Sequence, residues 1–140
     1  MKMYNINDYP IISDQKVAWG DMDAFGHVNN VMYYRYIESA RIDYLNALKL
    51  LELDFNLVVA SSQCKYLKPV FYPDVLKIGT TIVEVRNSAF RMEYLIWSEQ
   101  QNEVVATAEA VIVCVDNQTM KKALIPDHIK AIIFEIENKK

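Results

Sequence analysis

Two carboxylates lie just before a stretch that the sequence predicts to be a long helix. Asp21 and Asp23 are followed by Gly26 and then by Asn29 and Asn30, which are both favourable helix N-cap types. The first N–H groups of a helix lack an intrahelical partner and carry partial positive charge. A carboxylate beside them can act as a general base or as a nucleophile, while the N–H groups stabilise a developing oxyanion. This arrangement favours cleavage of an acyl group.

The composition fits one compact domain spanning residues 1–140. The chain is 52% hydrophobic and has a formal net charge of −3, so it can bury a core and lacks the basic field that nonspecific nucleic-acid binding needs. We find neither a secretory signal nor an apolar run of about 20 residues, and expect a soluble, cytoplasmic protein without a membrane span. Cys64 and Cys114 lack the spacing of a zinc site, which predicts two buried thiols and no metal.

The hydrophobic pattern predicts strands arranged around one helix. Apolar residues at three-and-four spacing predict a helix over 30–51, and a short amphipathic helix is predicted over 126–136 with Pro126 in its first turn. Alternating patterns predict five strands, over 15–20, 57–67, 75–85, 90–98 and 104–115. These elements indicate an α+β fold with a mostly antiparallel sheet.

The long predicted helix is apolar over most of its circumference. One side carries Tyr33 and Ile37, and the other carries Val31, Tyr34, Ile42 and Leu45. We therefore expect the helix to be enclosed on more than one side. In the last predicted strand, the middle of one face carries only small side chains, those of Ala106, Ala108 and Ala110. This pattern predicts that the helix packs against that face.

The segment from Trp19 to Arg41 resembles the signature of hotdog-fold acyl-CoA thioesterases, in particular the 4-hydroxybenzoyl-CoA thioesterase family. The match is Asp-x-Asp-x-x-Gly-His-Val-Asn-Asn followed by Tyr and then Glu-x-x-Arg. The segment from Tyr66 to Leu76 also resembles the end of the family's second strand and the turn that follows it. The resemblance implies an antiparallel sheet wrapped around one long central helix. It also implies hydrolysis of an acyl-CoA thioester to a carboxylic acid and free coenzyme A. Coenzyme A is then part of the substrate, and no further cofactor is implied.

The resemblance implies catalytic roles around the start of the helix. The second acid of the Asp-x-Asp pair, here Asp23, is the catalytic carboxylate in such enzymes. Backbone N–H groups from Asn30 to Met32, with that of Val31 among them, would polarise the thioester carbonyl. Asn29 would orient the attacking water or Asp23, or else cap the helix. The sequence does not separate a general base from a nucleophile.

The substrate-binding candidates follow from the same resemblance and from charge. Because coenzyme A is a polyanion, a chain of net charge −3 must bind it with a few placed cations. Arg86 and Ser88 match a family hairpin that contacts pantetheine and phosphates. Gly26 and His27 are expected beside the substrate, although both can be purely structural. The remaining candidates are Lys65, Lys68 and Arg91 as cations, and Tyr33, Tyr34, Ile37, Phe55 and Val59 in the acyl pocket.

Two other carboxylates compete with Asp23. Some hotdog thioesterases place the working carboxylate on the central helix, which makes Glu38 a candidate. Arg35 and Arg41 lie three residues to either side of Glu38, so a surface ion pair is the alternative. Asp21 should point away from Asp23 in an extended segment, and we expect it to stabilise the loop.

Three functions are compatible with the sequence: an acyl-CoA hydrolase, a non-catalytic acyl-CoA sensor, and a thioesterase that acts on acyl carrier protein. An intact Asp23 favours hydrolysis over sensing. The resemblance also implies a homodimer or homotetramer with its sites at the subunit interface. Asp23 of one subunit would then meet helix and hairpin residues of the other.

Overall fold

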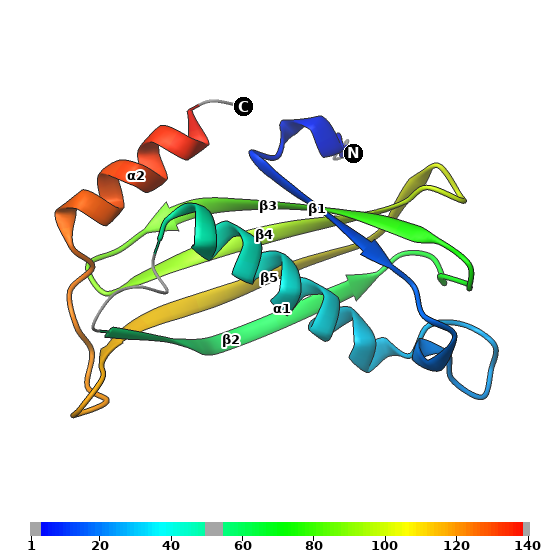
Figure 1. The fold of residues 1–140 in the computed structure, drawn as a ribbon, viewed down its shortest axis with the longest axis horizontal. Coiled ribbons are helices and arrows are strands. Elements are labelled where there is room, and N and C mark those ends of the chain that lie inside the picture. Colours follow the sequence, from blue (N-terminus) through cyan, green and yellow to red (C-terminus); the bar gives the residue numbers. More distant parts are fainter. Residues whose placement is uncertain (1–3, 50–54, 139–140) are drawn as a thin grey trace.

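A five-stranded antiparallel sheet with a long helix lying across one face forms the body of the protein (Figure 1). The computed structural model describes residues 4–49 and 55–138. The strands lie in the order β1-β3-β4-β5-β2. The elements are η1 (Ile6–Asp8), β1 (Ile11–Lys16), η2 (Trp19–Asp21), α1 (Asn30–Ala47), β2 (Phe55–Tyr66), β3 (Val75–Val85), β4 (Ala89–Ser98), β5 (Glu103–Asp116) and α2 (Asp127–Glu137). The predicted α+β class is confirmed.

The four later strands agree closely with the prediction, but the first does not. The strand predicted over 15–20 ends at Lys16, because β1 pairs with β3 from Ile11↔Thr80 to Lys16↔Val75, and β3 begins at Val75. Beyond that point the chain turns into η2. There the Asp21 carboxylate accepts a hydrogen bond from the N–H of Ala18 at 3.0 Å.

Helix α1 begins where predicted and ends earlier. Asn29 is its N-cap and accepts from the N–H of Val31, whereas Lys49 adopts a φ of 57°, which stops the helical path. Leu51, the predicted last residue, lies outside the described residues. In α2, Pro126 is the N-cap rather than part of the first turn. Within the described chain, neither helix is long and apolar enough to cross a membrane.

The core lies between α1 and the sheet. Tyr33, Ile37 and Tyr44 of α1 are buried in one cluster with Ala106 and Ala110 of β5, which agrees with the predicted packing of the helix over small residues. The expected enclosure of α1 on more than one side is wrong for a single chain. The sheet is open and covers one side only. On the other side Val31 is 70% exposed, and Tyr34 and Ile42 are each 39% exposed.

The N-terminal segment packs on the sheet face opposite α1. Ile78 and Thr80 face the core, so Gly79 between them faces away from it. The Tyr9 side chain fills the space above Gly79, because a Cβ built there would lie 2.5 Å from Cγ of Tyr9. Glycine is therefore required at 79 for close contact.

We predict that Gly79→Ala lowers the free energy of unfolding by about 1–3 kcal/mol, the usual cost of overpacking a buried position. Urea denaturation measures the change. Gly20→Ala is the matched control, because a Cβ at Gly20 meets no atom within 4 Å. Equal stability of the two variants would contradict the proposed contact.

Candidate active site

The segment between η2 and α1 folds into a small hairpin that presents Asp23. Met22 and Val28 form an isolated antiparallel bridge. The N–H of Asp23 donates to the carbonyl of His27 at 2.9 Å, and the N–H of Gly26 donates to the carbonyl of Asp23 at 3.2 Å. Gly26 has a φ of 87°, a conformation that residues with a Cβ rarely adopt. The hairpin therefore needs glycine at this position.

The Asp23 carboxylate accepts a backbone hydrogen bond through one oxygen and faces His27 with the other. Oδ1 accepts from the N–H of Phe25 at 2.8 Å. Oδ2 lies 3.7 Å from Nδ1 of His27, and the Asp23 side chain is 21% exposed. The His27 ring also meets the Phe71 ring edge to face. His27 thus contributes to the loop structure, and the Asp23 side chain keeps part of its surface exposed to solvent.

The first turn of α1 offers one free donor beside this loop. Asn29 caps the helix, because its Oδ1 accepts from the N–H of Val31 and its carbonyl accepts from the N–H of Met32. The N–H of Asn29 itself donates to the carbonyl of Asp21. Among N–H groups 30–32, that of Asn30 alone donates to no acceptor in the described part of the chain. The N–H of Asn30 is therefore the donor that the helix start leaves available, and the N–H of Val31 is already occupied.

Asp21 connects the loop to helix α1 through a side-chain hydrogen bond. Its Oδ2 accepts from the Tyr36 hydroxyl at 2.5 Å and from the N–H of Ala18 at 3.0 Å. Burial and the neighbouring Asp21 carboxylate raise the pKa of Tyr36 far above its usual value, which keeps the hydroxyl protonated as a donor. The expectation that Asp21 stabilises the loop is confirmed. Sequence reasoning missed Tyr36, whose partner lies 15 residues away.

A cleft of about 190 Å³ lies next to Asn30, and both His27 and Tyr33 line it. Tyr66 forms another wall: its hydroxyl donates to the carbonyl of Asn30 at 3.1 Å, and its ring meets the Tyr33 ring edge to face at 4.9 Å. Burial raises the pKa of both tyrosines to about 12, so both hydroxyls are neutral near pH 7. Tyr66 was not identified as a site residue from the sequence.

Most of the other predicted acyl-pocket residues do not line this cleft. Ile37 belongs to the core, whereas Tyr34 and Val59 lie on the surface of the single chain. The side chain of Phe55 lies outside what the structure describes. Tyr33 is therefore the member of the predicted set that the structure brings to Asn30.

Arg86 and Ser88, the main predicted coenzyme A contacts, do not lie near Asp23 in one chain, whereas Lys68 lines the cleft beside Asn30. Arg86 and Ser88 follow the end of β3, and the Asp23 loop bonds to Val70 before its start. The 11 residues of β3 span roughly 36 Å between these ends (Figure 1). Arg86 is also bound to Glu84 at 2.9 Å. Of the secondary candidates, Lys68 pairs with Glu103, and Arg91 pairs with Glu84, Glu93 and Glu109.

The predicted helix-surface ion pair at Glu38 is wrong. Within the described residues Glu38 makes no ion pair. Arg41 turns inward instead, is buried, and donates from Nε to the Tyr94 hydroxyl at 2.9 Å. Glu38 is exposed and stands eight residues into α1, about 12 Å along the helix from Asn30. It is therefore too far along the helix to share a carbonyl with the N–H of Asn30.

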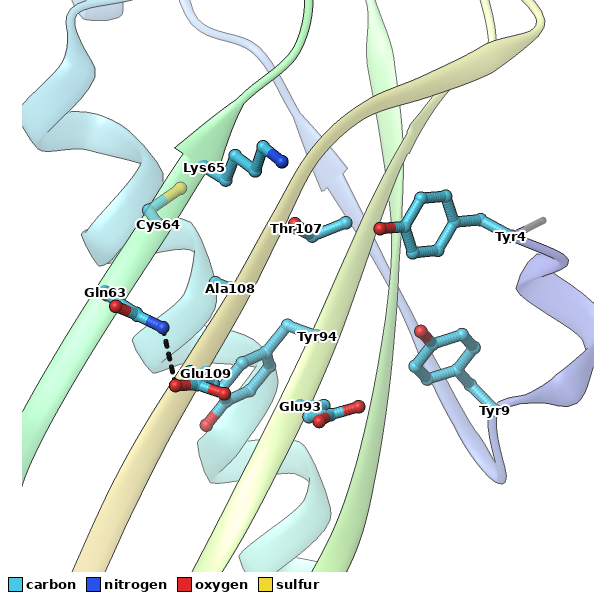
Figure 2. Close-up of a pocket in the computed structure, with 10 residues that line it drawn as sticks. All are labelled: Tyr4, Tyr9, Gln63, Cys64, Lys65, Glu93, Tyr94, Thr107, Ala108 and Glu109. Carbon is cyan, nitrogen blue, oxygen red and sulfur yellow. Dashed lines mark hydrogen bonds between the residues drawn. The ribbon is translucent and has the colours of Figure 1, made fainter. Parts of the chain in front are cut away.

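A separate pocket of about 280 Å³ lies under Tyr4 and Tyr9 (Figure 2). It opens on the sheet face opposite α1, and the carboxylates that line it, those of Glu93 and Glu109, both have hydrogen-bond or ion-pair partners. Glu109 accepts from Gln63 and pairs with Arg91, which also pairs with Glu93. None of its lining residues belongs to the Asp23 loop. Across the described chain, no group of three or more His, Cys, Asp or Glu side chains is placed to hold a metal ion.

Comparison with known proteins places this fold and loop in one family. The sequence profile of the thioesterase-like superfamily matches residues 17–133. YsmA of Bacillus subtilis, an uncharacterised protein, is 32% identical over 84% of this chain and 81% of its own length. The long-chain acyl-CoA thioesterase FadM of Escherichia coli is 26% identical over 82% of this chain and 90% of its own.

A solved structure of a thioesterase supports the same family assignment. The thioesterase of Thermus thermophilus, crystallised with coenzyme A and Zn, superposes with a TM-score of 0.82 at 30% identity, covering 95% of this chain and 98% of that one. The protein therefore belongs to the thioesterase-like superfamily. The predictions of a hotdog fold and of a thioesterase family are confirmed.

We predict that Tyr36→Phe lowers the free energy of unfolding by about 1–3 kcal/mol, because Asp21 loses a hydrogen bond made to a charged, partly buried group. Chemical denaturation at neutral pH measures the loss. Tyr34→Phe serves as the control, since Tyr34 is on the same helix but exposed. If both variants unfold alike, the hydroxyl of Tyr36 does not hold the loop.

Proposed function

We propose that the protein hydrolyses acyl-CoA thioesters, with Asp23 as the working carboxylate and the N–H of Asn30 as the donor to the thioester carbonyl. One observation carries this proposal. A hydrogen-bonded loop holds the Asp23 carboxylate, whose side chain is 21% exposed, and leads directly into the helix start, where the N–H of Asn30 has no acceptor in the described chain. The acyl-CoA thioesterase activity named for FadM and the coenzyme A bound by the Thermus protein support the substrate class.

The reaction follows from these two groups. The carbonyl oxygen accepts from the N–H of Asn30, which stabilises negative charge on that oxygen as the carbon is attacked. Oδ2 of Asp23 either takes a proton from the attacking water or attacks the carbon itself to form a mixed anhydride that water then opens. The carbon–sulfur bond breaks, and coenzyme A leaves as a thiolate that gains a proton. Both routes give one carboxylic acid and one thiol.

His27 and Tyr33 would form the substrate side of the site. Both line the cleft that reaches Asn30, so an acyl group whose carbonyl meets that N–H enters between them. Gly26 lets the hairpin turn tightly enough to leave this approach open. Asn29 acts through the helix start as its N-cap. The acyl chain length stays open, and the cytoplasmic location stays a prediction from the sequence.

We infer that a second copy of the chain completes the site. β2 is an edge strand of 12 residues, and α1 leaves Val31, Tyr34 and Ile42 exposed. Long unpaired edges are usually covered. A twofold, antiparallel arrangement of two β2 strands would bring the Arg86 hairpin of one copy toward Asp23 of the other. This arrangement explains why one chain keeps Arg86 far from Asp23, and it applies to a homodimer or to each half of a homotetramer.

We predict that Asp23→Asn lowers turnover by at least about 100-fold, the lower range for loss of a positioned acid or base. Release of free thiol from short, medium, long and aromatic acyl-CoA esters measures this and identifies the acyl class. Glu38→Gln is the matched control, because it removes a carboxylate of α1 that lies too far from Asn30 to act on the same carbonyl and should retain activity. Full activity in Asp23→Asn together with loss of activity in Glu38→Gln would show that Glu38 of α1 is the working carboxylate instead of Asp23.

We predict that Ile42→Glu shifts the protein toward monomers and lowers its thioesterase activity, because it places a charge in the apolar surface of α1. Sedimentation velocity and thiol release report the two effects. Ile12→Glu is the matched control, since Ile12 is 42% exposed on the opposite edge strand β1. A fully active wild-type monomer would contradict the two-copy site.

A further inference from the structure

Four exposed aromatic side chains lie on two neighbouring segments, 19–27 and 67–73, at one end of the molecule (Figure 1). Trp19 is 74% exposed, Phe25 86%, Phe71 50% and Tyr72 45%. Two edge-to-face ring contacts join the segments: Trp19 meets Tyr72 with centroids 5.8 Å apart, and His27 meets Phe71. We call the four exposed residues the aromatic patch. Exposed apolar groups that gather in this way mark an interaction surface.

The exposed surface around the aromatic patch carries little charge. Along the described residues 18–31 and 69–73, every exposed side chain is uncharged. Asp74, which follows, is buried and hydrogen-bonded. Lys16 and Glu99 line the cleft beside the patch, one charge of each sign. A pattern of complementary charges usually steers and orients a specific protein partner. The described surface of the patch offers no such pattern.

The second copy inferred above does not cover the Trp19–Tyr72 pair. β1 and β2 are the opposite edges of the sheet. Trp19 follows the end of β1, and Tyr72 precedes β3, which is the neighbour of β1. A partner that pairs along β2 approaches from the other edge and leaves this part of the patch open. The aromatic patch therefore needs a different occupant.

The patch also borders the cleft that reaches Asn30. His27 lines that cleft and packs against Phe71. Leu67 and Pro69, on the segment that leads to Phe71, line the cleft as well. An apolar chain that leaves an apolar medium at the patch therefore has a short path into the candidate active site.

We propose that the aromatic patch docks on a lipid bilayer, from which the protein takes long-chain acyl-CoA. Tryptophan and tyrosine favour the boundary between acyl chains and headgroups, and Phe25 lies in the turn of the hairpin that carries Asp23. The acyl chain leaves the bilayer at the patch and enters the cleft, while the polyanionic coenzyme A end stays in water. This inference rests on the proposed thioesterase function and assigns it acyl groups long enough to partition into lipid.

Tryptophan fluorescence tests the docking directly. The chain has two tryptophans, Trp19 and Trp97, so Trp97→Phe leaves Trp19 as the reporter and Trp19→Phe leaves Trp97. Vesicles of phosphatidylcholine should shift Trp19 emission to shorter wavelength, and the same lipid with brominated acyl chains should quench it. Trp97 emission is the matched control and should not respond. Unchanged Trp19 emission would overturn the proposal. A shift that follows protein concentration without lipid would also overturn it, because another copy then covers the patch.

Cosedimentation with the same vesicles measures how strongly the patch binds. Trp19→Ala and Tyr72→Ala should each weaken partitioning at least about fivefold, because each removes a ring that leaves water on docking. Phe134→Ala is the matched control, since Phe134 is 72% exposed on α2, at the other end of the molecule (Figure 1). Adding phosphatidylglycerol should change partitioning little, because the patch is uncharged. Binding that requires the anionic lipid, or equal binding by the wild type and both patch variants, would overturn the proposal.

A kinetic comparison keeps this inference separate from the proposed function. A long-chain acyl-CoA bound to phosphatidylcholine vesicles and a short-chain acyl-CoA dissolved in water are offered in parallel. Trp19→Ala should lower kcat/KM for the vesicle-bound ester at least about fivefold and leave that for the short ester unchanged. An equal effect on both esters, or none on either, would overturn the docking role. Hydrolysis of neither ester by the wild type would instead overturn the proposed function, and the vesicle-binding experiments would still decide the docking surface.

Discussion

The arrangement of this site depends on the hydrogen bonds that converge on Asp21. Its carboxylate accepts from Tyr36, two turns into α1, and from Ala18 in the preceding turn, while its carbonyl accepts from the N–H of Asn29. These contacts fix the start of the helix against the loop that carries Asp23. Because Tyr36 is buried in the core, the packing of α1 on the sheet determines where the loop that carries Asp23 lies.

The same contacts decide which donor of the helix is free. Asn29 occupies the N–H groups of Val31 and Met32 and directs its own N–H to Asp21, so that of Asn30 alone is available among the first donors of the described helix. Helix ends normally leave several N–H groups for water. Here capping reduces the choice to one, so the proposed donor to the thioester carbonyl is a single N–H, that of Asn30.

Much of the fold could be predicted from local patterns, whereas long-range contacts could not. The later strands and the start of α1 follow from alternation and from the cap at Asn29. The first strand was misplaced, because its end depends on pairing with β3 and not on its own residues. Charge spacing on α1 predicted a pair at Glu38 but gave no sign that Arg41 turns inward to Tyr94. The roles of Tyr36 and Tyr66 were missed for the same reason, since their partners are distant in sequence.

A crystal structure with an unreactive acyl-CoA analogue, in which a methylene group replaces the thioester sulfur, tests the central claim most directly. The account predicts the carbonyl oxygen about 2.7–3.1 Å from the backbone nitrogen of Asn30. It also predicts an Asp23 oxygen, or a water bound to it, about 3–3.5 Å from the carbonyl carbon. A carbonyl bound at Glu38, or one turned away from Asn30, would contradict it.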